Sequence, residues 1–302
     1  MSCSCDAPFA NIGANPCKDI RKVARRFILV PEFDSTGSKN EISDLASLTK
    51  ATLQAKFDAP NIADRWFPTP EMENVESVRD NAVVQEFNSG KKAKVRDGVK
   101  TMTVYFPLQG NLWMGKLEKF ECLKYGFYAI DADGNFIYTK CPDTGVLKPI
   151  LVEPDTTDVE YMEATDTEVS MVKLTFDIKL SEKDAEQRVV EASELDFDAL
   201  DENDVYSLWD VEVSYSDIST TSFKAALATD FGVKVAGLVQ TDFTLLNQTT
   251  SLAVPITGFT ETPSGTYKID YAAQASADVL VLTVVKSKFD FAKVVESTIL
   301  IP

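Results

Sequence analysis

Residues 168–180 read EVSMVKLTFDIKL, and this stretch decides the fold. From Val172 to Leu180 every second residue is apolar, and the residues between them are Lys, Thr or Asp. An alternation with a period of two places one set of side chains on each face of a sheet, so it predicts a half-buried β-strand. At ~3.3 Å per residue the strand is long enough to lie at the centre of the main sheet.

The sequence before this strand predicts one helix and several more strands. The basic residues 21–26 lead into a strand that ends at Pro31, and a helix is expected over 41–57, capped by Asn40 or Ser43. Further strands are expected at 83–87, 99–108, 117–130 and 136–139, the last two joined by a hairpin turn at 131–135. Residues 88–98 are basic and bounded by glycine, which predicts an exposed loop or a hairpin arm.

The sequence after the long strand predicts a helix over 181–192, with Ser181 as its N-cap, and a strand over 205–215. Small polar residues at 216–222 then indicate a domain boundary. Short apolar runs follow at 233–235, 243–246, 252–256, 267–271, 279–285 and 297–301. Turn signals between them recur about every ten residues, which is typical of a small β-sandwich.

The expected fold is therefore mainly β. Residues 1–20 are expected to form an extended arm, because they lack periodicity and are rich in small residues. Residues 21–215 would form an α+β domain with long antiparallel strands and one or two helices, and residues 216–302 the sandwich.

The charge of the chain is strongly acidic and unevenly distributed. The formal net charge is -17, and residues 153–210 hold 19 acidic but only four basic residues. Binding to phosphate is driven by Lys and Arg, so this balance argues against a protein that wraps nucleic acid. There is no apolar run of 18 residues and the first residues do not resemble a signal peptide, so we expect no membrane contact and synthesis in a cytoplasm.

Cysteine and histidine usage predicts neither a metal site nor an enzyme. The five cysteines are an odd number, and the cluster of Cys3, Cys5 and Cys17 lacks a fourth zinc ligand. The chain has no histidine, which removes Ser-His-Asp and Cys-His catalysis. Carboxylates are abundant, but no pair stands out as an acid and a base. We expect no catalytic residue, no cofactor and no metal.

Two motifs resemble ligand sites but depart from them. Residues 110–117 read GNLWMGKL, close to the phosphate-binding pattern, yet Leu117 stands where a hydroxyl must bind magnesium. We expect a hairpin connection there. Residues 131–135 (DADGN) resemble the start of a calcium loop, but the glycine is fourth and not sixth, so we expect a hairpin turn.

Two groups of charged residues are candidates for contacts in an assembly. The basic group comprises Arg21, Lys22, Arg25, Arg26, Lys91, Lys92, Lys94 and Arg96. The acidic group, a candidate surface or channel lining, comprises Glu153, Asp155, Asp158, Glu160, Glu163, Asp196, Asp198, Asp201, Glu202 and Asp204. Docking of the basic group on the acidic region of a neighbouring copy would set register and orientation; a solvated surface is the alternative.

The C-terminal sequence resembles an immunoglobulin-like module. The resemblance rests on 237–238 (GL), 242–245 (DFTL), Glu261, 265–267 (GTY) and 277–280 (ADVL), and it implies a sandwich without a disulfide. Such modules are often appended to bacterial surface and phage structural proteins. The preceding part more loosely resembles phage tail-tube and related virion proteins, in its arm, its helix, its hairpin-forming sheet and its extended loop. That family implies stacked hexameric rings whose sheets join into a barrel, with an acidic lumen that does not hold passing DNA.

We therefore expect a non-enzymatic virion protein, made in the host cytoplasm, that forms a homo-oligomeric ring and contacts other virion proteins. DNA would be only passing cargo, and the sandwich would project outward with at most weak glycan contact. Two alternatives stay open. One is a capsid-decorating or head–tail connector protein, and the other is a carbohydrate-binding adhesin with Trp66, Trp113 or Trp209 on an exposed platform.

Overall fold

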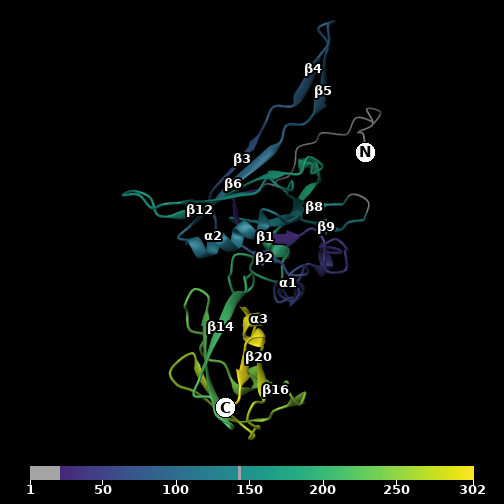
Figure 1. Cartoon of the computed structure of the whole chain (residues 1–302). Helices are drawn as coiled ribbons and strands as arrows, with labels where there is room; N and C mark the ends of the chain where they lie inside the picture. Colours follow the sequence, from purple (N-terminus) through teal and green to yellow (C-terminus); the bar gives the residue numbers. More distant parts are fainter. Residues whose placement is uncertain (1–20, 142–143) are drawn as a thin grey trace.

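A computed structural model describes residues 21–141 and 144–302 (Figure 1). The arm expected over 1–20, with its three cysteines, lies outside the described residues. The protein is mainly β, with 42% strand and 12% helix, which confirms the expected fold class. An N-terminal unit (residues 21–208) and a C-terminal sandwich (residues 209–302) each contain two main sheets.

The central layer of the N-terminal unit is a seven-stranded sheet that is buried on both faces. Its main order is β13-β8-β7-β1-β2, with β10 beside β7 and β9 beside β8. The strands are β1 (Ala24–Pro31), β2 (Phe67–Pro68), β7 (Tyr125–Asp131), β8 (Phe136–Lys140), β9 (Leu147–Lys148), β10 (Ile150–Leu151) and β13 (Gln187–Val190). Along β1, Phe27 and Leu29 join one apolar cluster while Ile28 and Val30 join another. Burial on both faces explains why β1 is a continuous apolar run.

A four-stranded sheet covers one face of this central layer. Its order is β11-β12-β6-β3, from β11 (Asp158–Met162), β12 (Met171–Ile178), β6 (Lys100–Pro107) and β3 (Glu73–Arg79). Strand β12 confirms the predicted central strand, with Val172, Leu174 and Phe176 fully buried. The ring of Phe176 lies 5.3 Å from that of Phe127 in the seven-stranded sheet, so the two sheets share one core.

The opposite face of the central layer is covered by a short helix and a loop. Helix α1 (Lys50–Phe57) contributes Leu53 and Phe57, and the segment 197–206 contributes Phe197 and Val205. The helix expected over 41–57 is wrong before residue 50. There Asp44 caps a single 3-10 turn, η1 (Leu45–Ser47), and Thr49 caps α1, because their side chains accept the backbone N–H groups that a longer helix would use.

The proposed cap Asn40 has another role. It is buried, and its amide donates to the carbonyl oxygens of Pro31 and Ala63 at 3.1 and 2.8 Å. Ser43 instead bonds the hydroxyl of Ser47 at 2.9 Å. Neither residue caps a helix.

Further sequence expectations are wrong in the N-terminal unit. The strand expected over 117–130 begins only at Tyr125. Residues 111–117 form helix α2 (Asn111–Leu117), followed by the 3-10 turn η2 (Glu118–Phe120), and not a hairpin connection. Residues 181–192 form the 3-10 turn η3 (Asp184–Glu186) and strand β13, and not a helix. The β-branched Val189 and Val190 favour a strand once β8 is available as a partner.

Strands β4 (Val83–Glu86) and β5 (Lys92–Arg96) form a separate two-stranded hairpin that projects from the end of β3 and β6 (Figure 1). It confirms the hairpin arm expected around residues 88–98.

The C-terminal sandwich packs two sheets around a core of its own. One has the order β18-β19-β15-β14-β21 and the other β17-β16-β20-β22. The strands are β14 (Trp209–Ser216), β15 (Ser222–Thr229), β16 (Phe243–Asn247), β17 (Leu252–Ala253), β18 (Ile256–Glu261), β19 (Thr266–Tyr271), β20 (Val279–Val284), β21 (Phe289–Asp290) and β22 (Thr298–Leu300). The sandwich also contains the 3-10 turn η5 (Gln240–Asp242) and helix α3 (Ala292–Glu296). A further 3-10 turn, η4 (Ala192–Glu194), lies in the N-terminal unit.

The boundary between the two units differs from the expected residue 216. Strand β14 pairs with β15, and its Val211 lies in the core of the sandwich, so the sandwich begins at Trp209. The expected strand at 233–235 is only an isolated bridge between Ala228 and Lys234.

Candidate assembly interface

The most unusual feature of the surface is the β4–β5 hairpin. Every residue from 76 to 97 is exposed. Cross-strand pairs join Glu86 to Lys92 and Val84 to Lys94. The turn is closed by the N–H of Phe87, which donates to Lys91 at 2.8 Å, and Gly90 adopts the positive φ of +77° that this turn requires.

Apolar side chains on the hairpin are open to solvent. Val83, Val84, Phe87 and Val95 are between 42% and 61% exposed. An isolated two-stranded hairpin is at best marginally stable in water. The described chain provides no cover for this one.

The hairpin is also positively charged on an acidic protein. Residues 79–98 hold five basic and three acidic residues. Lys92 pairs with Glu86 at 3.3 Å and Lys94 pairs with Asp97, but all four side chains are more than half exposed. Such pairs contribute little to stability, so the ammonium groups stay available to a partner. Lys91 and Arg96 are exposed as well.

The other half of the basic group differs in exposure: Lys22 is exposed, Arg21 and Arg25 are half-buried, and Arg26 is buried. Lys22 pairs with Asp133 at 2.8 Å, Arg25 pairs with Glu73 at 3.1 Å, and Arg21 donates to Gln187. Arg26 is only 4% exposed and donates to the carbonyl oxygens of Thr69 and Val205 at 3.1 and 2.8 Å. Burial lowers the pKa of Arg26. The expectation that Arg26 is an exposed docking residue is therefore wrong.

The acidic group is divided between opposite sides of the central sheet. Asp158 and Glu160 lie on β11, and Glu153, Asp155 and Glu163 flank that strand on the side of the four-stranded sheet. The remaining five residues lie on the loop that covers the other face, beside α1. The described N-terminal unit thus has two acidic surfaces and not one.

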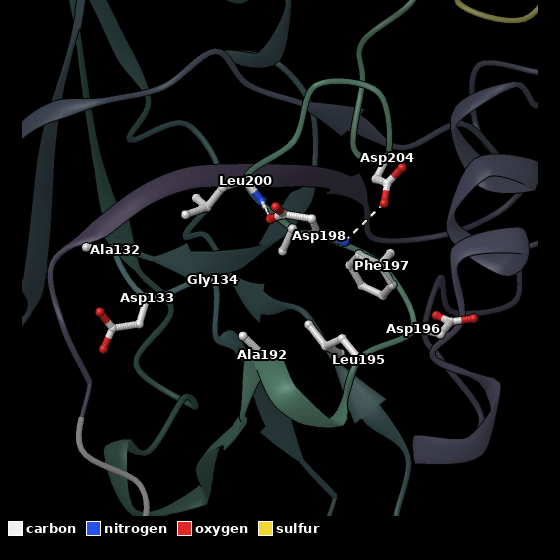
Figure 2. A pocket seen from close by; sticks show the side chains of 11 residues that line it. Ala132, Asp133, Gly134, Ala192, Leu195, Asp196, Phe197, Asp198, Leu200 and Asp204 are labelled. Carbon is white, nitrogen blue, oxygen red and sulfur yellow. Dashed lines mark hydrogen bonds between the residues drawn. The ribbon is translucent and has the colours of Figure 1, made fainter.

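Polar contacts within the loop 196–204 and with Lys50 of α1 hold this loop in place. It borders an open hollow of about 630 Å³, shown in Figure 2. Asp204 accepts Lys50 Nζ at 2.5 Å and the N–H of Asp198 at 3.0 Å, and Asp196 accepts the N–H of Lys50 at 2.8 Å. The hydrogen bond from Lys50 lowers the pKa of Asp204. Within the described residues no group of three or more Cys, Asp or Glu is arranged to hold a metal ion.

The outer face of the four-stranded sheet carries carboxylates and hydroxyls in rows. One row is Glu160, Lys173, Tyr105 and Glu73, and the next is Asp158, Thr175, Thr103 and Glu76. Asp177 accepts the hydroxyl of Thr101 at 2.6 Å. Lys173 is bound to Glu160, whose hydrogen bond raises the pKa of that lysine. The face is therefore acidic overall.

The alternation of Thr101, Thr103 and Tyr105 with apolar residues was the sequence signal for this face. That alternation does not contain the register that aligns those residues with Glu73 and Glu76, because the register depends on strands that are distant in the sequence.

The turn at 131–135 is a hairpin turn as expected. The buried carboxylate of Asp131 accepts four N–H groups, from Lys22, Asp133 and Asn135, at 2.9 to 3.2 Å. These donors occupy the oxygens that a calcium ion would need.

The three tryptophans differ in exposure. Trp66 is 1% exposed, and Trp113 packs against Phe106 with the ring centres 4.8 Å apart. Trp209 is 44% exposed and meets the ring of Phe231 edge-on at 6.0 Å. Only Trp209 presents an open aromatic surface.

No protein-family model and no curated protein matches the chain. None of the helices in the described residues is both long and apolar enough to cross a membrane.

Proposed function

We propose that this protein is a structural subunit that assembles with copies of itself into rings, in the manner of a tail-tube protein of a tailed phage. The exposed β4–β5 hairpin is the observation that carries the proposal. The hairpin exposes apolar side chains, and a two-stranded hairpin by itself is only marginally stable. Both properties are explained if a neighbouring subunit covers it. The function is then mechanical and not enzymatic.

The surface that receives the hairpin is the β11 edge of the next copy. Among the described strands β11 pairs with β12 alone, so its other edge is open to a further strand, although the N–H of Val159 donates to Glu121 Oε1 at 3.3 Å. Asp158 and Glu160 are exposed there and stand two residues apart, which is also the spacing of Lys92 and Lys94 on β5. Opposite charges directly across a strand pair are favourable and fix its register.

The outer face of the four-stranded sheet would line the channel of such a ring. Its carboxylates repel the phosphates of DNA, and its only lysine among the rows described above is already paired with Glu160. DNA would pass without being held. The loop with Asp196 and Asp204 lies on the other side of the central sheet and would face away from that channel.

Negative-stain electron microscopy of the purified protein, concentrated and at moderate salt, tests the assembly. We expect stacked rings or tubes with a central channel. A trimer or a twelvefold ring would favour a decorating or connector protein instead, and a monomer at every concentration would contradict the proposal.

Charge reversal tests the contact. Lys92→Glu with Lys94→Glu should abolish the rings, and adding Asp158→Lys with Glu160→Lys should restore them. The matched control is Lys224→Glu with Lys268→Glu, two paired lysines on neighbouring strands of the sandwich that change the net charge equally. The control should assemble like the unaltered protein.

A second function, glycan binding, is favoured by one observation, the exposed Trp209. Titration of the protein with neutral oligosaccharides would quench or shift the fluorescence of Trp209 if that ring binds sugar, and Trp209→Ala would remove the response. No change with any glycan would exclude this function.

A further inference from the structure

The two units of the protein have separate cores. The apolar cluster of the sandwich draws its buried residues from 211–301, and the two clusters of the N-terminal unit draw theirs from 27–206. Within the described residues no cluster includes side chains of both units. The chain passes between the units once, from Leu208 to Trp209.

Polar contacts hold the two units against each other, and three cations make them. The first is Arg65, whose Nη1 lies 2.5 Å from Asp290 Oδ2, with side chains only 12% and 18% exposed. The second is Lys288, whose Nζ donates to Asn203 Oδ1 at 2.7 Å and lies 5.6 Å from the ring centre of Tyr206.

The third cation is Lys116, in the last turn of α2. Its ammonium contacts Asp210 at 2.8 Å and Asp230 at 2.5 Å, and lies 4.9 Å from the ring centre of Phe231. The side chain of Asp230 is only 10% exposed, so loss of Lys116 would leave a largely buried carboxyl group without this partner. Burial alone would lower the pKa of Lys116, but the two carboxylates outweigh it and the pKa is raised. The lysine of the sequence GNLWMGKL therefore joins the two units.

We propose that Arg65, Lys116 and Lys288 form an ionic latch that fixes the orientation of the C-terminal sandwich. When the latch is released, the sandwich swings as a rigid body about residues 208–209, and both cores stay folded. Salt screens the more exposed Lys116–Asp210 pair, screens the largely buried Arg65–Asp290 pair less, and does not weaken apolar packing, so raised ionic strength loosens the latch. A single covalent crossing and two independent cores are what a hinge between rigid bodies requires.

One residue of the latch, Lys116, and the hairpin lie at opposite ends of one strand. Strand β6 begins next to the hairpin, and α2 with Lys116 follows its other end (Figure 1). The proposal does not depend on assembly, because all of its contacts lie within one chain.

Limited digestion with chymotrypsin tests the latch in the full-length protein. The hinge offers Tyr206, Leu208 and Trp209 as cleavage sites for this protease. We expect Arg65→Glu with Lys116→Glu to raise the rate of cleavage at 206–209 by about tenfold, with two stable fragments as products. The radius of gyration from small-angle X-ray scattering should rise in the same variant, at a concentration where the protein is monomeric.

The matched control is Lys224→Glu with Lys293→Glu. Both lysines pair inside the sandwich, with Asp217 and Glu212, at 2.7 Å each. This variant should be cleaved at the rate of the unaltered protein.

Raising NaCl from about 50 mM to about 500 mM is the second measurement, and it needs no substitution. It should speed cleavage of the unaltered protein more than that of the Arg65→Glu, Lys116→Glu variant, whose latch is already open. Cleavage of the variant at the unaltered rate, or no difference in the response to salt, would overturn the proposal. So would complete degradation of both fragments, since the cores would then depend on the latch.

Discussion

The molecule contains two antiparallel hairpins, β7–β8 and β4–β5, with opposite surroundings. All seven residues of β7 and four of the five in β8 are buried, whereas all nine residues of β4 and β5 are exposed. The first hairpin is a scaffold, because its side chains fill two cores. The second is also an antiparallel pair, but it has no core, so its own packing contributes little to its stability. Strand pairing is therefore the same in both hairpins, and the burial of the side chains is what distinguishes the hairpin that forms the core from the one that lies on the surface.

The largest expected effect is a difference in unfolding free energy when a phenylalanine is replaced by alanine in each hairpin. Phe136 in β8 is fully buried and lies 4.9 Å from the ring of Tyr128, so Phe136→Ala should cost about 3–5 kcal/mol of unfolding free energy. Phe87→Ala, the same change in the exposed hairpin, should cost less than about 0.5 kcal/mol. Urea unfolding of monomeric protein measures both. A comparable loss in the two variants would show that the exposed hairpin is packed in solution.

A glycine in each hairpin sharpens the comparison. A Cβ on Gly126 in β7 would lie 2.8 Å from the carbonyl oxygen of Ile150, so Gly126→Ala should cost about 1–3 kcal/mol. A Cβ on Gly98, at the base of the exposed hairpin, would lie 1.8 Å from the carbonyl oxygen of Asp80. That clash is relieved by displacing the hairpin, so Gly98→Ala should reduce ring formation while the body keeps its unfolding midpoint. A large loss of stability in Gly98→Ala with normal rings would reverse the roles of the two hairpins.

The smallest expected effect is a pH dependence of the unfolding free energy, caused by Glu182, which lies beside the buried β7–β8 hairpin. Burial raises the pKa of Glu182 above its usual value near 4.5, against the opposing hydrogen bond from Thr139 of β8 at 2.9 Å. Its carboxylate is thus disfavoured in the folded state, and stability falls as pH rises from about 4.5 through the raised pKa. Glu182→Gln should be more stable at neutral pH by less than about 1 kcal/mol and equal near pH 4. Denaturation series at the two pH values measure this, and an equal difference at both would exclude the carboxyl as the cause.

Local patterns made part of this fold predictable. Strand β12 follows from its own alternation, and the turn at 131–135 follows from its Asp and Gly residues. Strand β13 does not, because Val189 and Val190 become a strand only through pairing with β8, some fifty residues earlier. The first half of the helix expected over 41–57 failed because Asp44 and Thr49 cap shorter elements.

The sequence was enough to predict which charged residues belong to the candidate site. It was not enough to predict which of them are exposed or which face of the protein they occupy. The lysines of the hairpin stayed exposed as expected, since their neighbours in sequence are also their neighbours in space. Arg26 turned inward because the carbonyl oxygens that receive it belong to Thr69 and Val205, which no local pattern connects to it. The acidic stretch was divided because its two halves cover opposite faces of the central sheet.

The single passage of the chain at residues 208–209 also determines how the protein can diversify. One recombination breakpoint there exchanges the entire C-terminal module without cutting a strand of either N-terminal sheet. A replacement module would keep the present orientation if it supplied carboxylates where Asp210, Asp230 and Asp290 now stand. A module without these carboxylates would still be linked covalently through residues 208–209, but its orientation would not be fixed.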